Sequence, residues 1–118
     1  MVVNVATDAL KKLAADHTLT SEQLAKAKAE VLNIQYVDLT GQQISSDVLQ
    51  LVPPEIAENY QLVPFKLESG VVSVACVSPE DFRAIEVLDF IGRQQKLRFQ
   101  YFSATPQSVH QALRQYGN

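Results

Sequence analysis

Few side chains in this sequence have the types and spacing that catalysis or metal binding requires. The only two histidines, His17 and His110, have neither another histidine nor a pair of carboxylates at the spacing of metal ligands. Glu80 and Asp81 are adjacent in the first turn of a predicted helix, so their side chains point apart and complement the positive helix end instead. Cys76 lies in an apolar segment, where a small buried filler is expected rather than a nucleophile. We therefore expect no catalytic group and no metal site.

The glycines argue against nucleotide hydrolysis. A Walker-type loop needs closely spaced glycines followed by Lys and then Ser or Thr, because backbone N–H groups and the lysine hold the phosphates. No glycine of this chain precedes such a pair, and the four are far apart: Gly41, Gly70, Gly92 and Gly117. We expect no cofactor, and we predict that the chain itself is not an enzyme.

One local cluster of basic residues has the composition of a binding surface. Arg93 follows a predicted helix, and Lys96 and Arg98 share the outward face of a predicted strand. A solvated face that complements the helix dipole explains these cations without any ligand. The alternative is contact with anionic groups on a protein partner, to which Tyr101 adds an aromatic anchor. The candidate partner-binding residues are Arg93, Lys96, Arg98 and Tyr101, with the predicted helix at Leu10–Leu13 as the other candidate surface.

The composition is typical of one small globular domain. The chain has 118 residues, of which 47% are hydrophobic and 19% charged, which is enough to build a single core. Its net charge of −3 argues against nucleic acid or an anionic membrane as the main partner. A single cysteine excludes an intramolecular disulfide and fits a reducing compartment, and no apolar run approaches the roughly 18 residues of a membrane span. We expect a cytoplasmic protein that does not insert into a membrane and reaches one only through partners.

The first 45 residues predict a helical hairpin and then a short extended segment. Thr7 can cap the first helix. The second begins at Thr20, which forms a capping box with Gln23 and thereby satisfies two backbone donors, the cap alone being worth about 1 kcal/mol. Asn33 can end this helix, because asparagine tolerates the left-handed conformation of a C-terminal cap. Residues 34–39 then read as an extended segment.

The rest of the chain predicts two short helices and then a β-β-α-β-α unit. Ser46 caps the first short helix, and Pro54 opens the second, since the first helical position needs no donor. Pro64 lacks a donor for a sheet ladder, so its strand, in which apolar and polar residues alternate, should lie at an edge. A turn at Ser69–Gly70 joins it to a second, near-continuously apolar strand at Val71–Val77.

Two longer helices alternate with the last strand. The first is predicted to start with a cap at Ser78 and to stop at Gly92, and the second to start at Thr105–Pro106. The helical crossover should make the second and third strands parallel, and we expect both helices to cover one face of a three-stranded sheet. The side chains expected in the core are Leu24, Val31, Val63, Phe65, Val72, Val74, Phe82, Ile85, Leu88, Leu97, Phe99, Val109 and Leu113.

The predicted fold class is therefore α+β. An N-terminal helical hairpin packs on a β-β-α-β-α core with a small mixed sheet. We predict a single domain over residues 1–118, divided into a helical subdomain at 1–45 and a β-β-α-β-α subdomain at 46–118.

One continuous stretch resembles a segment of a known family. From Leu51 to Phe65 the chain is similar to the "vP…A..y.lvP" segment in the N-terminal domain of the ATPases of type II secretion and type IV pilus assembly. The Ser-Pro-Glu-Asp start at residue 78, the Thr-Pro start at residue 105 and an aromatic at Tyr116 agree with the same family. The resemblance extends from about residue 10 to residue 116.

The resemblance implies a protein-docking role. In this family the domain is not the motor but is tethered to a nucleotide-hydrolysing body, and it docks on cytoplasmic parts of the inner-membrane platform. A non-catalytic docking domain, peripheral to the inner membrane through its partner, is therefore the expected function.

A branch of the same family binds cyclic di-GMP, which leaves nucleotide sensing as the alternative function. The motif of that branch has an arginine where this chain has Ala9, and glycines where it has Lys11 and Thr18. A later leucine of the motif is replaced by Lys28 and its closing glutamine by Val31, although the other leucine positions match. Bidentate guanine recognition by arginine and close backbone approach at glycine are both lost, so we do not expect cyclic di-GMP to bind.

Overall fold

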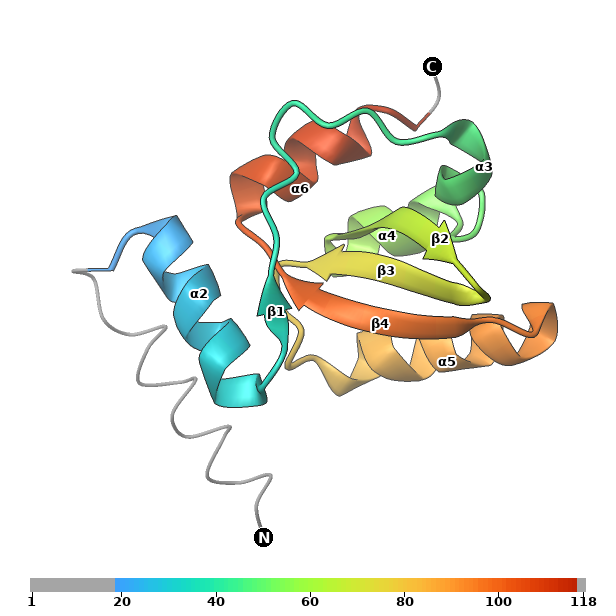
Figure 1. The fold of residues 1–118 in the computed structure, drawn as a ribbon, viewed down its shortest axis with the longest axis horizontal. Helices are drawn as coiled ribbons and strands as arrows, with labels where there is room; N and C mark the ends of the chain where they lie inside the picture. The colour runs from blue at the N-terminus through green and yellow to red at the C-terminus, as the bar shows by residue number, and fades with distance from the viewer. Residues whose placement is uncertain (1–18, 117–118) are drawn as a thin grey trace, which may run out of the picture.

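The computed structural model describes residues 19–116, and these form a four-stranded mixed sheet with helices on both faces (Figure 1). The strand order is β1-β4-β3-β2, in which β2 is antiparallel to β3, and β3, β4 and β1 are parallel to one another. This confirms the predicted α+β class and the parallel crossover. The strands are β1 (Gln35–Tyr36), β2 (Leu62–Glu68), β3 (Val71–Cys76) and β4 (Arg98–Ser103), and the described helices are α2 (Ser21–Leu32), α3 (Ser46–Leu49), α4 (Pro54–Tyr60), α5 (Phe82–Gln95) and α6 (Pro106–Leu113).

Helix α2 begins and ends where the sequence predicts. The Thr20 hydroxyl accepts a hydrogen bond from the Gln23 N–H (3.1 Å), and the Gln23 side-chain oxygen accepts one from the Thr20 N–H (2.9 Å). Asn33 closes the helix with a φ of 57°, which is the left-handed cap. The other helix of the predicted hairpin, capped by Thr7, lies outside the described residues.

The β2–β3 hairpin also follows the prediction, except for its side-chain alternation. Ser69 and Gly70 both have positive φ (52° and 78°), as a tight two-residue hairpin turn requires. β2 lies at the sheet edge, as Pro64 indicated. The pairing of β2 with β3 shifts register between Pro64 and Lys66, however, so Pro64 is buried and Leu67 is 45% exposed. The simple alternation predicted for this strand is wrong because a bulge exchanges the two faces.

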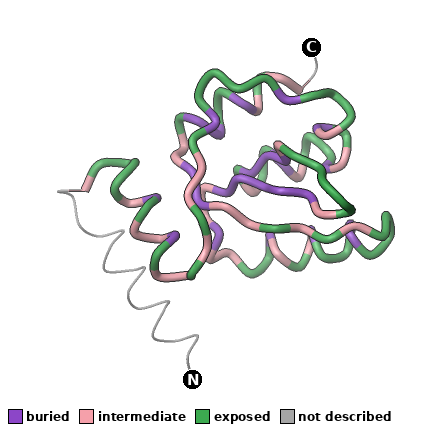
Figure 2. Tube along the Cα trace, viewed as in Figure 1, coloured by how far each residue is buried: buried purple, intermediate pink, exposed green. Residues whose placement is uncertain are grey.

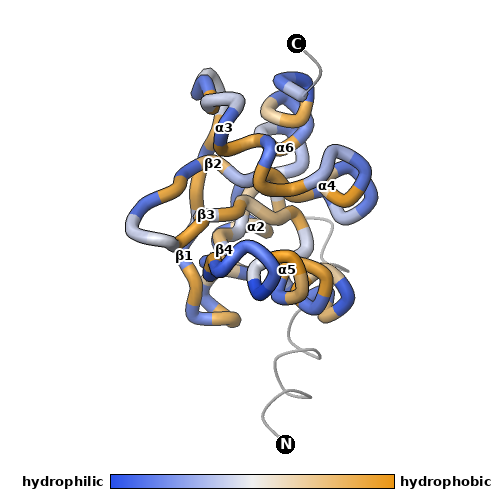
Figure 3. Tube along the Cα trace, turned by 90° about the vertical axis from the view of Figure 1, so that its right-hand side faces the viewer, coloured by the Kyte–Doolittle hydropathy of each residue, from blue (hydrophilic) through white to orange (hydrophobic). Residues whose placement is uncertain are grey.

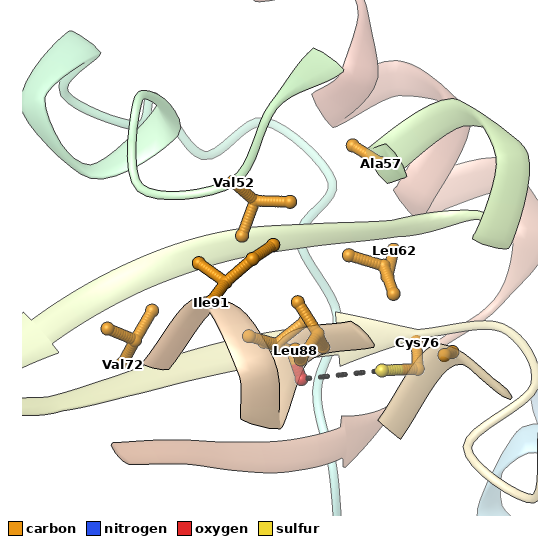
Figure 4. Close-up of a cluster of buried hydrophobic side chains, with 9 residues drawn as sticks. Val52, Ala57, Leu62, Val72, Cys76, Leu88 and Ile91 are labelled. Carbon is orange, nitrogen blue, oxygen red and sulfur yellow. Dashed lines mark hydrogen bonds between the residues drawn. The ribbon is translucent and has the colours of Figure 1, made fainter. Parts of the chain in front are cut away.

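The first sheet face is covered by α5 and α4. Val72 and Val74 of β3 pack against Leu88 and Ile91 of α5, and Ala57 adds the contribution of α4. Figure 4 shows Leu88 and Ile91 of α5 pointing toward the strands, with Leu62 and Val52 on the other side of the cluster. Because neighbouring residues of a strand point to opposite faces, the residues between them must be covered from the other side.

The second sheet face is covered by α6 and α3. Ala75 of β3 and Val63 of β2 pack with Val109 and Ala112 of α6 and with Leu49 of α3. Figure 2 shows β3 buried along most of its length between these layers. The expectation that both long helices share one face is wrong, since each face of the strands is apolar and needs its own cover.

A fourth strand comes from the segment predicted only as extended. Gln35 and Tyr36 pair in parallel with Phe102 and Ser103, so the sheet has four strands rather than the three expected. The Ser103 hydroxyl donates a 2.6 Å hydrogen bond to the carbonyl of Ala25, which fastens α2 to the same end of β4. Residues on both sides of position 45 thus contribute to one sheet, and the division into two subdomains stays a prediction.

The capping residues of two helices differ from those expected. α5 begins at Phe82, because Asp81 rather than Ser78 accepts the hydrogen bond from the Arg83 N–H (3.0 Å). Phe82 therefore stands at the first helical position, off the buried stripe, and is 61% exposed instead of in the core. α3 is capped by Ser45, whose hydroxyl accepts from the Val48 N–H, and not by the serine that follows it.

The C-terminal end of α5 lies one turn later than expected. The helix continues past Gly92 to Gln95, and Lys96 closes it with a φ of 58°. The Leu97 N–H then donates to the Gly92 carbonyl (2.8 Å), which turns the chain directly into β4.

Most of the predicted core is confirmed as buried or half-buried. The fully buried members are Val63, Val72, Val74, Leu88 and Val109, and the half-buried ones are Leu24, Val31, Phe65, Ile85, Leu97, Phe99 and Leu113.

Gly92 marks the closest approach of α5 to the chain that enters β4. A Cβ at this position would lie 2.6 Å from the carbonyl oxygen of Leu97 and 3.2 Å from the ring of Phe99. Glycine to alanine inside a helix normally stabilises by about 0.5–1 kcal/mol. We expect Gly92→Ala to destabilise by about 1–3 kcal/mol instead, because the backbone of Leu97 cannot yield without disturbing β4.

Chemical denaturation measures this difference. The control is Gln94→Ala on the exposed side of the same helix, which should change the free energy of unfolding by no more than about 0.5 kcal/mol. A Gly92→Ala protein as stable as the parent would show that α5 and β4 are less closely packed than described.

Candidate functional site

An open groove of about 500 Å³ runs between α5 and the start of β4. α5 lies beside β4 in both views of the fold (Figures 1 and 3). We call this feature the α5–β4 groove, and its lining residues are Asp89, Arg93, Leu97, Arg98 and Phe99.

The groove brings together two of the predicted partner-binding residues. Arg93 lies within the last turn of α5 rather than beyond its end, and Arg98 is the first residue of β4. Although five positions apart in the chain, both line the same groove. The left-handed cap at Lys96 reverses the chain between them and so brings the last turn of α5 next to the first residue of β4.

Lys96 itself is placed differently from the prediction. It forms the cap of α5 and does not belong to β4, so it does not share a strand face with Arg98. It is exposed next to the groove and is not among the residues that line it.

The three cations have no anionic partner within residues 19–116. No carboxylate lies within 4.0 Å of Arg93, Lys96 or Arg98, whereas four other basic side chains are paired in this way: Lys26 with Glu22, Lys28 with Glu80, Lys66 with Glu68 and Arg83 with Asp81. Asp89 lines the groove, but the bond that its carboxylate accepts comes from Tyr101. The guanidinium groups therefore remain available to an anionic group from outside.

The Tyr101 side chain packs within the domain and is not free to contact a partner as the sequence analysis suggested. Its side chain is half-buried against the α5 face of the sheet, and its hydroxyl donates to the Asp89 carboxylate at 3.4 Å. Burial, followed by the negative charge of Asp89, raises the pKa of Tyr101 well above its ordinary range. The phenol stays protonated and links α5 to β4 behind the groove.

Sequence reasoning missed an exposed aromatic residue on α5, the helix that contributes Asp89 and Arg93 to the groove. Phe90 is 57% exposed and lies between Asp89 and Arg93 on α5. The signal was present in the sequence, because Phe90 falls off the Ala84–Leu88–Ile91 stripe that faces the core. An exposed Phe on the same helix as an Arg that has no carboxylate partner within residues 19–116 is a composition typical of an interface.

The remaining chemical groups do not form a site within the part of the chain that the structure describes. No group of three or more His, Cys, Asp and Glu side chains there could hold a metal ion. Burial raises the pKa of the Cys76 thiol to about 12, so the thiol is not a reactive thiolate near neutral pH. His17 lies outside the described residues. None of the described helices is both long enough and apolar enough to cross a bilayer.

A family comparison identifies the relatives of this arrangement. The sequence profile of the MshEN domain matches residues 32–118, which include every lining residue of the groove. The chain belongs to the MshEN domain family. This confirms the predicted relation to the N-terminal domains of type II secretion and type IV pilus ATPases. Among curated protein sequences, none gives a significant match to the chain.

Solved structures share the fold of this MshEN domain. The structure of MshE with cdg superposes with a TM-score of 0.73 at 18% identity, covering 98% of this chain and 87% of that one. The N-terminal domain of XpsE in crystal form I4122 gives a TM-score of 0.70 at 17% identity, covering 92% of this chain and 72% of that one. In another crystal form the same domain gives 0.68 at 17% identity, covering 85% and 69%.

The raised pKa of Tyr101 predicts how the free energy of unfolding changes at alkaline pH. Its folded pKa lies above the unfolded value of about 10, so its stabilising contribution is complete below that pH and is lost as the pH rises further. In Tyr101→Phe this loss is absent. We expect the stability advantage of the parent over the variant, about 0.5–1.5 kcal/mol near pH 7, to shrink as the pH rises above about 10.

Urea denaturation across this pH range measures the effect. Tyr116→Phe should behave in the same way, because burial also raises the pKa of Tyr116. An advantage of the parent that stays constant up to pH 11 would contradict the placement of Tyr101 against α5.

Proposed function

We propose that this MshEN domain is a non-catalytic docking module that binds the cytoplasmic part of an inner-membrane platform protein through the α5–β4 groove. It would link a type II secretion or type IV pilus assembly ATPase to that platform, on the cytoplasmic side and at the membrane only through its partner. The proposal depends on one observation. Arg93 and Arg98 both line an open groove, and neither has a carboxylate partner among the described residues.

The groove combines charge with apolar surface. Leu97 and Phe99 supply apolar lining, and α5 also carries the exposed ring of Phe90. A standard interface needs roughly 800 Å² of each partner, with aromatic and arginine anchors near its centre. Lys96, exposed beside the groove, would mainly affect the association rate, as charges at an interface rim do.

Other described surfaces offer less to a partner. α2 is held to the segment between β3 and α5 by its own contacts, since Lys28 donates to the Val77 carbonyl and pairs with Glu80 (both 3.2 Å). The alternative docking surface, the predicted helix at Leu10–Leu13, lies outside the described residues and is kept as the alternative site.

Charge reversal tests this proposal. We expect Arg93→Glu combined with Arg98→Glu to weaken binding to the platform protein at least tenfold, which is a loss of about 1.4 kcal/mol or more. The melting temperature should stay nearly unchanged, because both side chains are exposed and unpaired among the described residues. Interferometry with the cytoplasmic part of the platform protein measures the affinity.

The control carries the same change of charge away from the groove. Lys26→Glu combined with Arg83→Glu alters α2 and the first turn of α5, where both cations are exposed. This double variant should bind like the parent. Equal binding by the groove variant and the parent would move the docking surface elsewhere, first to Leu10–Leu13.

Cyclic di-GMP sensing is the second candidate function, because the solved structure of MshE with cdg shares this fold. The motif positions at Ala9, Lys11 and Thr18 lie outside the described residues, but Lys28 can be followed. Its ammonium stands where the motif has a leucine, and it is held by Glu80 and the Val77 carbonyl. The sequence lacks the arginine and the glycines of the motif, so we favour docking.

Titration calorimetry separates the two candidates. We expect no binding of cyclic di-GMP at micromolar concentrations. Binding in that range would make sensing the primary function, and a loss of that binding in a variant of Leu24 would place the nucleotide on α2.

A further inference from the structure

The outer edge of β4 is only partly occupied by another strand. β1 has two residues, and they pair with Phe102 and Ser103 at the end of β4. Within residues 19–116, no strand pairs with residues 98–101 on that side of the sheet (Figure 1). An open edge of this kind presents backbone donors and acceptors to a further strand.

The hydrogen bonds of β4 show which backbone groups face this edge. The N–H groups of Arg98 and Ala104 donate to β3 and the turn before it, at 3.0 Å to the carbonyls of Gly70 and Cys76 respectively. The Ser103 carbonyl instead accepts from the Val37 N–H at 2.9 Å, on the β1 side. Because alternate residues of a parallel strand direct their backbone groups to opposite sides, those of residues 99 and 101 face the open edge.

We propose that an extended segment of the partner adds to this edge as a new strand, continuing the line that β1 begins. The inference rests on the proposed docking function and names its mode: recognition through the backbone of Phe99 and Tyr101, with side chains of the segment adding selectivity. The α5–β4 groove runs along the same edge, so an added strand would lie over it.

The charges and faces of β4 define the chemistry of that segment. Phe99 packs on the α5 face of the sheet, and its neighbour Arg98 therefore points to the opposite face. Every second side chain of the added strand would lie over Leu97 and Phe99 in the groove, and the others would lie beside Arg98. The segment is therefore expected to alternate apolar and acidic residues, with Arg93 and Lys96 adding to its attraction.

A second copy of this chain fits the edge poorly. Pairing of two β4 edges would bring together two copies that both carry Arg93, Lys96 and Arg98 near this edge, and like charges across paired strands are destabilising. The opposite edge of the sheet, β2, is interrupted by a bulge and contacts α3 and α6. An acidic partner segment at β4 is the occupant that the charges favour.

Backbone amide exchange measured by NMR tests this mode. The probe is an acetylated, amidated heptapeptide that alternates Val and Glu, added in excess to the full 118-residue chain. We expect exchange at the Phe99 and Tyr101 amides to slow at least tenfold. The Gln100 amide is the internal control, because it faces β3 and should not change.

Two further peptides separate backbone recognition from simple charge attraction. N-methylation of alternate amides, in two analogues that cover both registers, removes the donors of the added strand. In at least one of these analogues the protection should disappear. Lysine in place of glutamate should abolish binding, since it opposes Arg93 and Arg98.

Two results would contradict strand addition. One is unchanged amide exchange at Phe99 and Tyr101 when the peptide is added. The other is equal protection of these amides by the parent peptide and by both methylated peptides. Slow exchange of these two amides in the absence of peptide also contradicts strand addition by a partner. If the protection increases with protein concentration, the edge is occupied by a second copy. If the protection does not depend on concentration, another part of the same chain covers the edge. The two proposals can also fail separately. If charge reversal abolishes platform binding but the peptide protects neither amide, the docking proposal is supported and strand addition is excluded.

Discussion

The arrangement of this domain depends on burying β3 from both sides. Val72 and Val74 face α5 while Ala75, between Val74 and Cys76, faces α6, and all of these side chains are inaccessible or nearly so. A strand that is apolar on both faces is stable only in the middle of a sheet with a layer on each side. β2 and β4 must therefore flank it, and the two longer described C-terminal helices must separate to opposite faces.

The candidate site follows from the same constraint. α5 has to lie close over β3 and β4, and it does so where Gly92 leaves room for the carbonyl of Leu97 and the ring of Phe99. The chain then reverses within a single left-handed cap at Lys96. This tight return makes Arg93 and Arg98 line one groove, and the hydrogen bond between Tyr101 and Asp89 holds helix and strand together there.

A shared fold can thus carry different surfaces within one family. The described part of this MshEN domain superposes on the structure of MshE with cdg, yet Lys28, where the resemblance implies a leucine of the nucleotide motif, is engaged by Glu80. A half-buried ammonium in place of a leucine is tolerated because a carboxylate and a carbonyl oxygen lie within 3.2 Å of it. The scaffold therefore says little by itself about the ligand, and the charges on each surface must be read separately.

Local chemistry in the sequence was sufficient for most elements and for the family. The capping box at Thr20 and the Ser69–Gly70 turn depend on neighbouring residues only, so they could be predicted and are confirmed. Arg93 and Arg98 could likewise be chosen as candidates from their types and proximity in the chain. The fourth strand, the bulge after Pro64 and the exposure of Phe82 could not, because each depends on which distant segment lies alongside. Tertiary packing alone decided that the two arginines share a groove and that, among residues 19–116, no strand covers the edge of β4 beside them.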